Sequence, residues 1–356
     1  MKRKYKQIRV KRNSKLFKRK LVSRQKLKSK RKSQQNVSSR GRYSNTVYNK
    51  GYAKVRAPQN LSMIYDPEKT IAFINALKGL YAKKKKVFVI LKDVSYIGYD
   101  ALIVLLSILI RFKASKIDFN GDFPTNIIVR KILLDSGFFD YFKSTFEEQD
   151  RYELSKKRSL STHAWKLVDS ELTSELIEEA SMTIWSEKRR CQGVQRSLIE
   201  LMQNTNNHAD IFKEGEKHWF LSVQHRKKEN IVSFSFVDFG IGVFESLNNK
   251  TSESKWYKWQ NKLFSLFTIN NNKELLKLIL NGSLHKTVTG KYYRGKGLPG
   301  IYDAFNRKQI NKLHIITNDV FADVENNNFL SLSNFFSGTF VYWEVVRNNI
   351  NLEWIE

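Results

Sequence analysis

The sequence predicts an α/β protein in which a long basic arm precedes two α/β domains. Residues 1–56 contain 22 Lys or Arg and no Asp or Glu. Residues 57–148 alternate short apolar strands with amphipathic helices, and residues 173–348 combine such elements with glycine-containing turns. The polar stretch 149–172 predicts a linker, and residues 349–356 form a short C-terminal tail.

The basic arm carries most of the net charge of +29 in this 356-residue chain. Outside it, 41 basic residues face 34 acidic ones. Few large apolar residues and many Ser, Asn and Gln predict that the arm is disordered when free. Such an arm binds polyanions by counterion release, with little sequence preference. RNA, DNA and an anionic membrane surface all fit this charge, as does a solubilising or targeting tail without a specific partner.

Composition excludes several classes of protein. The single cysteine, Cys191, excludes an internal disulfide framework and predicts a cytoplasmic location. No apolar run approaches the ~20 residues that span a bilayer, and the basic N-terminus lacks the apolar region of a signal peptide. Six scattered histidines and one cysteine show no zinc-ligand spacing.

The first domain is predicted from an alternation of strands and helices. In order, these are a strand over 60–65, a helix that begins at Asp66 and Pro67, a strand over 87–91, a helix from Asp100, a strand over 116–119 and a helix over 126–136. Asp66 is an N-cap residue, and a proline fits the first helical position. The continuous apolar run of 87–91 is typical of a strand buried on both faces. Gly137 ends the last helix.

The turn before the second helix reads Val94-Ser95-Tyr96-Ile97-Gly98-Tyr99-Asp100-Ala101-Leu102. It resembles the turn of the STAS fold of anti-sigma-factor antagonists, which reads Asp-Ser-Ser-Gly-Leu in phosphorylatable members. Asp100 then occupies the phosphoserine position. The resemblance implies a domain that is not phosphorylated there and carries a permanent negative charge at a helix N-terminus. A simpler interpretation is that Asp100 is an N-cap, and both can hold together.

In the second domain, the first motif lies on a helix that begins near Val194. Glu200, Asn204 and His208 follow at intervals of four residues and share a face, which Asn207 borders. An Asn carbonyl is a suitable Mg²⁺ ligand, and a Glu one turn earlier can orient or deprotonate a water or hydroxyl. The same pattern also fits a solvated polar face.

The second motif follows a predicted strand over 231–237. Asp238 ends this strand, and Gly240 and Gly242 let the backbone approach a ligand closely. A fixed carboxylate there can accept a hydrogen bond from the exocyclic amine of adenine. A simple turn between strands is the alternative. A protein-kinase Asp-Phe-Gly site is excluded, because no His-Arg-Asp loop or Val-Ala-Ile-Lys strand accompanies it.

The third motif is Arg294-Gly295-Lys296-Gly297-Leu298-Pro299-Gly300. Its Gly-x-Gly-x-x-Gly spelling lacks the βαβ unit of a dinucleotide site. We predict instead a flexible loop whose backbone N–H groups and Lys296 meet phosphates at the start of a helix over 301–305.

These three motifs, with Gly338-Thr339 in a last strand, resemble the GHKL (Bergerat-fold) ATPases over residues 172–346, which implies an α/β sandwich with a mixed sheet covered by helices. This family includes gyrase B, MutL, the histidine kinases and the anti-sigma-factor serine kinases. The resemblance implies that Asp238 binds adenine, supported by Thr339, and that Gly240 and Gly242 shape that end of an ATP pocket. It also implies that Asn204 holds Mg²⁺ and phosphates. The remaining implied nucleotide contacts are Asn207, His208, Arg294, Gly295, Lys296, Gly297 and Leu298.

Glu200 is the implied catalytic residue, because family members that hydrolyse ATP or phosphorylate serine tend to carry Glu there. The run Leu-Met-Gln-Asn-Thr-Asn-Asn-His-Ala looks most like the anti-sigma serine kinases. A long segment, 243–294, stands where the family has its ATP lid, and its aromatic residues also suit a docking surface. A histidine kinase is disfavoured, since no helix pair bears a phosphoacceptor motif.

The expected function is therefore an ATP- and Mg²⁺-dependent switch that regulates a protein partner through the STAS-like domain. Slow ATP hydrolysis and serine/threonine phosphotransfer are both compatible with Glu200. Homodimerisation is possible, as in several relatives. The alternative is a nucleic-acid-binding scaffold that uses residues 1–56 and has a non-catalytic nucleotide pocket.

Overall fold

The computed structural model describes residues 50–139, 142, 160–165, 168, 170–208, 219–248, 271–282, 297–349 and 354. Most of the predicted arm, residues 1–49, lies outside these ranges. Its last residues do not fit the prediction of disorder, because Ala53–Arg56 form strand β1. Residues 52–356 form one compact unit. Within its described part, no helix is long and apolar enough to cross a membrane.

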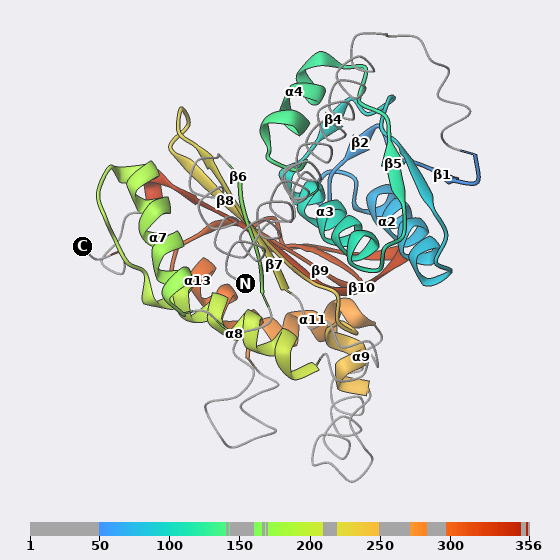
Figure 1. The fold of residues 1–356 in the computed structure, drawn as a ribbon. Helices are drawn as coiled ribbons and strands as arrows, with labels where there is room; N and C mark the ends of the chain where they lie inside the picture. Colours follow the sequence, from blue (N-terminus) through green and yellow to red (C-terminus); the bar gives the residue numbers. More distant parts are fainter. Residues whose placement is uncertain are drawn as a thin grey trace, which may run out of the picture. The chain divides into compact units, whose positions relative to one another are not determined.

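The N-terminal half of this unit is built on a parallel sheet (Figure 1). Its strands follow the order β1, β3 (Val87–Ile90) and β5 (Phe119–Gly121). Its helices are α2 (Pro67–Ala82), α3 (Tyr99–Ala114) and α4 (Ile127–Asp135). The two-residue strands β2 (Asn60–Leu61) and β4 (Tyr96–Ile97) also pair in parallel. This half is therefore of the α/β class, as predicted.

In this half, the capping residues correctly predicted where α2 and α4 begin and where α4 ends. The Asp66 side chain accepts a hydrogen bond from Lys69 N, and a proline stands at the start of α2. Asn126 caps α4 through Ile128 N and Val129 N, and Gly137 follows the helix with φ +82°. The predicted strand over 60–65 is confined to two residues. The predicted strand at 116–119 begins only at 119, and Lys116, with a left-handed φ of 56°, lies in the turn before it.

Asp100 has a different role from either prediction. The N-cap of α3 is Gly98, so Asp100 lies inside the first helical turn. Its side chain is buried and accepts hydrogen bonds from Ser62 Oγ (2.7 Å) and Met63 N (2.6 Å). Burial raises the pKa of Asp100, and these hydrogen bonds oppose that rise. Asp100 therefore anchors the loop between β2 and α2, and it does not present a charge at the surface.

The described part of the C-terminal half contains a five-stranded sheet whose neighbouring strands are all antiparallel, which corrects the expectation of a mixed sheet. Its order is β6 (Leu160–Trp165), β7 (Trp219–Arg226), β8 (Ile231–Asp238), β10 (Asn328–Val346) and β9 (Asn311–Asp323). Strand β6 corrects the prediction of a linker over 149–172, since it forms one edge of this sheet.

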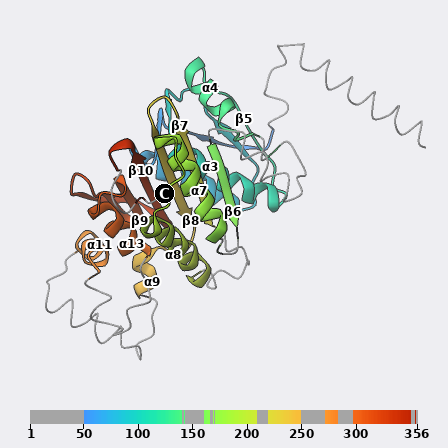
Figure 2. The ribbon, with the colours of Figure 1, turned by 90° about the vertical axis from the view of Figure 1, so that its left-hand side faces the viewer.

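Four helices line one face of this sheet and share its core: α7 (Ser170–Trp185), α8 (Gln192–His208), α11 (Asn272–Leu280) and α13 (Gly297–Asn306). Figure 2 shows α7 and α8 in front of the strands. In this core, Phe234 and Trp343 stack with ring centroids 5.1 Å apart. Apolar residues on the opposite face, such as Phe220, Val237 and Phe340, belong instead to the core that contains α2 and α3. The antiparallel sheet thus has helices on both faces.

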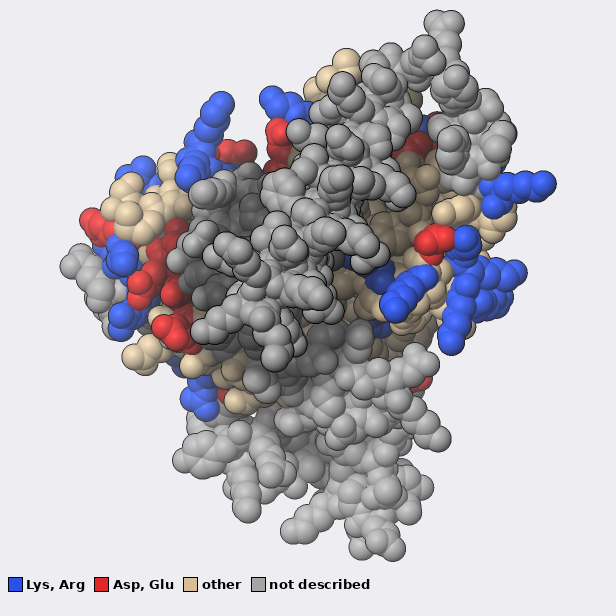
Figure 3. All heavy atoms as spheres, viewed as in Figure 1, with Lys and Arg blue, Asp and Glu red and all other residues tan. Residues whose placement is uncertain are grey.

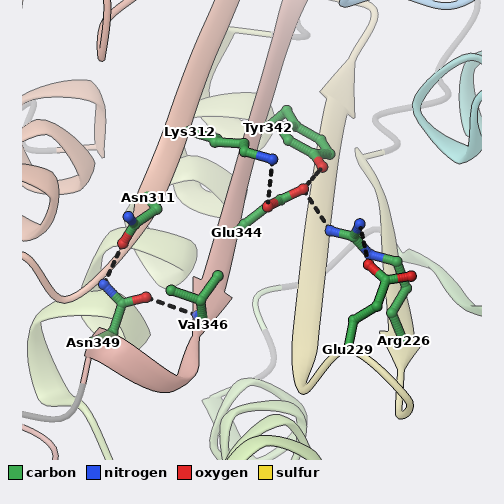
Figure 4. A network of polar contacts seen from close by, with 8 residues as sticks. All are labelled: Arg226, Glu229, Asn311, Lys312, Tyr342, Glu344, Val346 and Asn349. Carbon is green, nitrogen blue, oxygen red and sulfur yellow. Dashed lines mark hydrogen bonds and ion pairs between the residues drawn. The ribbon is translucent and has the colours of Figure 1, made fainter.

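A buried carboxylate joins three strands at the sheet end away from Asp238 (Figure 4). Glu344 accepts hydrogen bonds from Tyr342 Oη and Arg226 Nη2, each at 2.6 Å. Lys312 Nζ lies 3.2 Å from its other oxygen. Only 4% of the Glu344 side chain is exposed, so the two cations compensate a charge that would be costly to bury alone. This network fixes the register of β7, β9 and β10.

Candidate functional site

Helix α8 positions the first predicted site residues. Its buried stripe, which includes Val194, Leu198 and Met202, packs into the core and leaves Glu200 and Asn204 half-buried beside it. The Glu200 carboxylate accepts a hydrogen bond from Arg196 Nε at 3.2 Å, one turn earlier. The backbone of Asn207 and His208 completes the last turn of α8.

Helix α13 begins directly against Asn204. A Cβ atom on Gly297 would lie 2.7 Å from Asn204 Nδ2 and 3.4 Å from Leu201 N, so a larger residue there would displace the Asn204 carboxamide. The first N–H groups of a helix have no partners within it, and here they lie beside the Asn204 carboxamide. The helix starts four residues before the predicted 301, and Leu298 is buried in its first turn. Arg294, Gly295 and Lys296 lie outside the described residues.

Asp238 lies at the end of β8, opposite Thr339 of β10 and Trp219 of β7. Its Oδ1 accepts a hydrogen bond from Gly240 N at 2.9 Å, and the backbone N–H of Thr339 donates a second. Burial raises the pKa of Asp238 to about 6 against these two hydrogen bonds. The residue is partly exposed, and each oxygen of a carboxylate can accept more than one hydrogen bond, so Asp238 has acceptor capacity beyond these two donors.

Strand β9 holds the turn that follows Asp238. Thr317 Oγ1 accepts from Val243 N at 3.0 Å, and Asn318 Oδ1 accepts from Phe244 N at 3.0 Å. Asn318 Nδ2 donates to Ile241 O at 2.8 Å. These bonds fix the start of α9 (Val243–Asn248).

The absence of a side chain at Gly242 leaves the space that Asn318 of β9 occupies. Gly242 has φ +80°, and a Cβ there would lie 2.4 Å from Asn318 Nδ2. Sequence reasoning identified Gly242 but missed Thr317 and Asn318. The available signal was the polar Thr-Asn-Asp interruption between Ile316 and Val320 in an otherwise apolar strand.

The predicted residues thus form two groups on different layers. Glu200, Asn204 and Gly297 belong to the helix layer, and Asp238 and Thr339 belong to the sheet end. In Figure 1, α8 and α9, the helix that follows the Asp238 turn, both lie on the lower side of the antiparallel sheet. The two groups therefore border the same side of the molecule.

The described residues contain no cluster of three or more His, Cys, Asp or Glu side chains that could hold a metal ion. Mg²⁺ usually keeps several waters and binds through one or two protein oxygens plus substrate phosphates. A single half-buried carboxamide at Asn204, beside a helix N-terminus, fits that kind of shared site. Of the predicted lid 243–294, α9 and α11 are described, and residues 249–270 and 283–294 are not.

Comparisons with protein-family models, curated proteins and solved structures find no match to this chain. Function must therefore be inferred from these two groups of residues.

Proposed function

We propose that this chain binds ATP and Mg²⁺ at a GHKL-type site formed by α8, the start of α13 and the Asp238–Gly242 turn. The observation that carries the proposal is the position of Asp238. A carboxylate held at a strand end by Gly240 N and Thr339 N, with its pKa raised to about 6, is ionised at pH 7 and retains acceptor capacity. The helix-covered sheet supports a Bergerat-type sandwich, and the β1-β3-β5 half supports a STAS-like domain.

Each residue has a distinct role in this proposal. Asp238 accepts a hydrogen bond from the adenine amine. The Asn204 carbonyl shares Mg²⁺ with the phosphates, and the N–H groups at the start of α13 contact phosphate oxygens. Glu200 takes the proton from a water or from a serine or threonine hydroxyl as the γ-phosphoryl group leaves ADP. Its exposed ion pair with Arg196 is weak, so it does not prevent this role.

The first test is an incubation of the full chain with Mg²⁺ and γ-labelled ATP that measures both free phosphate and label retained on protein. Removal of a general base typically lowers the rate about 10²–10⁴-fold, so we expect that loss in Glu200→Ala and Glu200→Gln. Arg196→Met removes only the ion-pair partner and should retain most activity.

The two products separate the two reactions. Free phosphate that depends on Glu200 indicates an ATPase, and acid-stable label on protein indicates a serine/threonine kinase. Wild-type protein that binds no ATP at millimolar concentration would overturn the proposal.

A second candidate function, nucleic-acid binding, is favoured by the distribution of lysines on the N-terminal half. One end of the parallel sheet collects the N-termini of β1, β3 and β5 and the C-termini of α2 and α3. We call this the lysine end; its exposed members are Lys54, Lys83, Lys84, Lys85, Lys86, Lys113 and Lys116. Figure 3 shows Lys and Arg gathered on the side of β1 and α2.

Consecutive lysines give the lysine end its charge. Lys86 pairs with Asp118, whereas Lys83, Lys84 and Lys85 are consecutive and exposed. The basic segment 1–49 joins the fold at β1, which belongs to the same end. The strongly exposed apolar residues Tyr65, Ile127 and Ile128 follow the opposite strand ends, whereas at the lysine end the half-buried Tyr52 ring lies beside Lys86. A nucleic-acid backbone is the partner that this chemistry favours.

A salt titration tests the lysine end. Fluorescence anisotropy with labelled single-stranded RNA and duplex DNA should give a salt slope that falls by about 2–3 when Lys84, Lys85 and Lys113 are all changed to Gln. A matched triple variant of exposed lysines elsewhere, Lys69→Gln, Lys92→Gln and Lys131→Gln, should retain the wild-type slope. Equal slopes for both triples, or binding only to anionic vesicles, would contradict the assignment.

A further inference from the structure

Two cations from the N-terminal half contact the residue next to Asp238. Lys78 Nζ of α2 lies 5.2 Å from the centroid of the Phe239 ring, and the Arg111 guanidinium of α3 lies 5.0 Å from it. The Phe239 ring also packs against Phe336 of β10, and 8% of the residue is exposed. Cation–π contacts are stronger when they are shielded from water. The turn that bears Asp238 is therefore tied to two helices outside the C-terminal half.

Lys78 also contacts the strand on the other side of Asp238. Its Nζ donates to Ser337 Oγ and lies 3.4 Å from Ser337 O. The next residue, Gly338, accepts from Thr317 Oγ1 at 3.2 Å, and Thr339 then pairs with Asp238. One side chain of α2 thus touches both β10 and the turn residue that follows Asp238.

Two further side chains of α2 hold the preceding part of β10. The Glu68 carboxylate accepts from Ser333 N at 2.5 Å and from Asn334 N at 3.2 Å. Asn75 Nδ2 donates to Phe335 O at 2.7 Å. The pairing of β10 with β9 is irregular in this segment, with register shifts on both sides of Phe336. Since the sheet ladder is interrupted there, α2 supplies much of what fixes residues 333–337.

We infer that α2, through Lys78 and its contacts with Phe239 and Ser337, couples the N-terminal half to the state of the Asp238 turn. A ligand that binds Asp238 orders residues 238–242 and 337–339, and that order favours the docked position of α2. By linkage, the docked position of α2 raises the affinity for the ligand by the same factor by which the ligand favours docking, so a change in α2 that loosens this contact weakens ligand binding. The identity of the ligand rests on the proposed function, whereas the coupling itself does not.

The chemistry of Lys78 provides a second way to perturb the contact. Burial, with a smaller contribution from Arg111, lowers the pKa of Lys78 to about 8. The groups that face it from β8 and β10, Phe239 and Ser337, are uncharged. The Lys78 cation is therefore present at pH 7 and largely lost by pH 9.5, which removes the contact of Lys78 with the Phe239 ring without a mutation.

Hydrogen exchange of the ligand-free full chain tests the coupling directly. We expect Lys78→Met to raise exchange about 10-fold in residues 238–242 and 333–339, and wild-type protein to show the same change at pH 9.5 after correction for intrinsic rates. Lys69→Met is the matched control, because this lysine lies on the same helix with 75% of its side chain exposed. Lys78→Arg keeps a cation, so its corrected exchange rates should be the same at pH 7 and pH 9.5. Wild-type exchange rates in Lys78→Met would overturn the inference.

ATP affinity separates this inference from the proposed function. If wild-type protein binds ATP, we expect Lys78→Met to weaken binding about 5–30-fold, within the usual range of coupling between sites, and Lys69→Met to leave it unchanged. If wild-type protein binds no ATP, the proposed function fails, and the exchange result alone decides the coupling. If Lys78→Met does not fold, the exchange rates of wild type and Lys78→Arg between pH 7 and 9.5 test the coupling, because only wild type loses its cation.

Discussion

Asp238→Asn is expected to weaken ATP binding about 100-fold or more. The substitution replaces one oxygen acceptor by an amide that donates, so the adenine amine would meet either a donor or the oxygen that Gly240 N already occupies. Loss of a charge-assisted hydrogen bond that leaves groups unpaired costs about 1.5–3 kcal/mol, which corresponds to about 10- to 100-fold, and the new donor adds repulsion. Isothermal titration calorimetry with ATP and Mg²⁺ measures the loss.

The pH dependence of the same titration gives an internal check. Because the pKa of Asp238 in the folded protein is about 6, wild-type affinity should fall as the pH drops below 6, while the residual affinity of Asp238→Asn should not follow that curve. Asp303→Asn, an exposed carboxylate on α13, is the control and should bind as wild type does. Wild-type affinity in Asp238→Asn would show that adenine does not bind there.

The direction of this pKa shift also argues that Asp238 is not a stabilising residue. A carboxyl group whose pKa is higher in the folded than in the unfolded state opposes folding once the pH exceeds the unfolded value. Asp238→Asn should therefore not lower the unfolding midpoint at pH 7. A charge kept at such a cost beside a glycine-rich turn is more typical of a binding residue than of a structural one.

Local signals in the sequence were sufficient for several elements. Asp66 with Pro67, and Asn126 with Gly137, fixed two helices through caps that depend on adjacent residues only. The alternation over 231–237 predicted β8, and the cross-strand position of Thr339 beside Asp238 agrees with the order of motifs.

Long-range contacts account for the elements that were mispredicted or missed. Strand β6 carries the polar residues Ser161, Thr162 and His163 and pairs with β7, whose residues lie nearly sixty positions later in the chain. The start of α13 depends on the contact of Gly297 with Asn204, which is 93 positions earlier in the chain. The role of Asp100 depends on a loop nearly forty residues before it. No window of neighbouring residues contains these contacts.

Gly338→Ala is expected to be the most destabilising single substitution among those considered, by about 3 kcal/mol or more. Gly338 has φ +129°, and a Cβ there would lie 2.1 Å from Asp238 O. Backbone strain of this kind costs about 1–3 kcal/mol, and overpacking adds about 1–3 kcal/mol. The clashing atom belongs to backbone, so a rotamer change cannot relieve it, and β8 and β10 must separate where Asp238 meets Thr339. Urea denaturation measures the loss.

Gly79→Ala makes the same chemical change in a different environment. Gly79 lies within α2, and a Cβ there meets nothing within 4 Å. Alanine in a helix interior is favoured over glycine by about 0.5–1 kcal/mol, so this variant should be slightly more stable than wild type. If Gly338→Ala lowers the free energy of unfolding and Gly79→Ala raises it, the destabilisation by Gly338→Ala arises from the β8–β10 contact. A wild-type midpoint for Gly338→Ala would mean that the strands are not held together at Asp238, and the geometry of the candidate site would then have to be rejected with it.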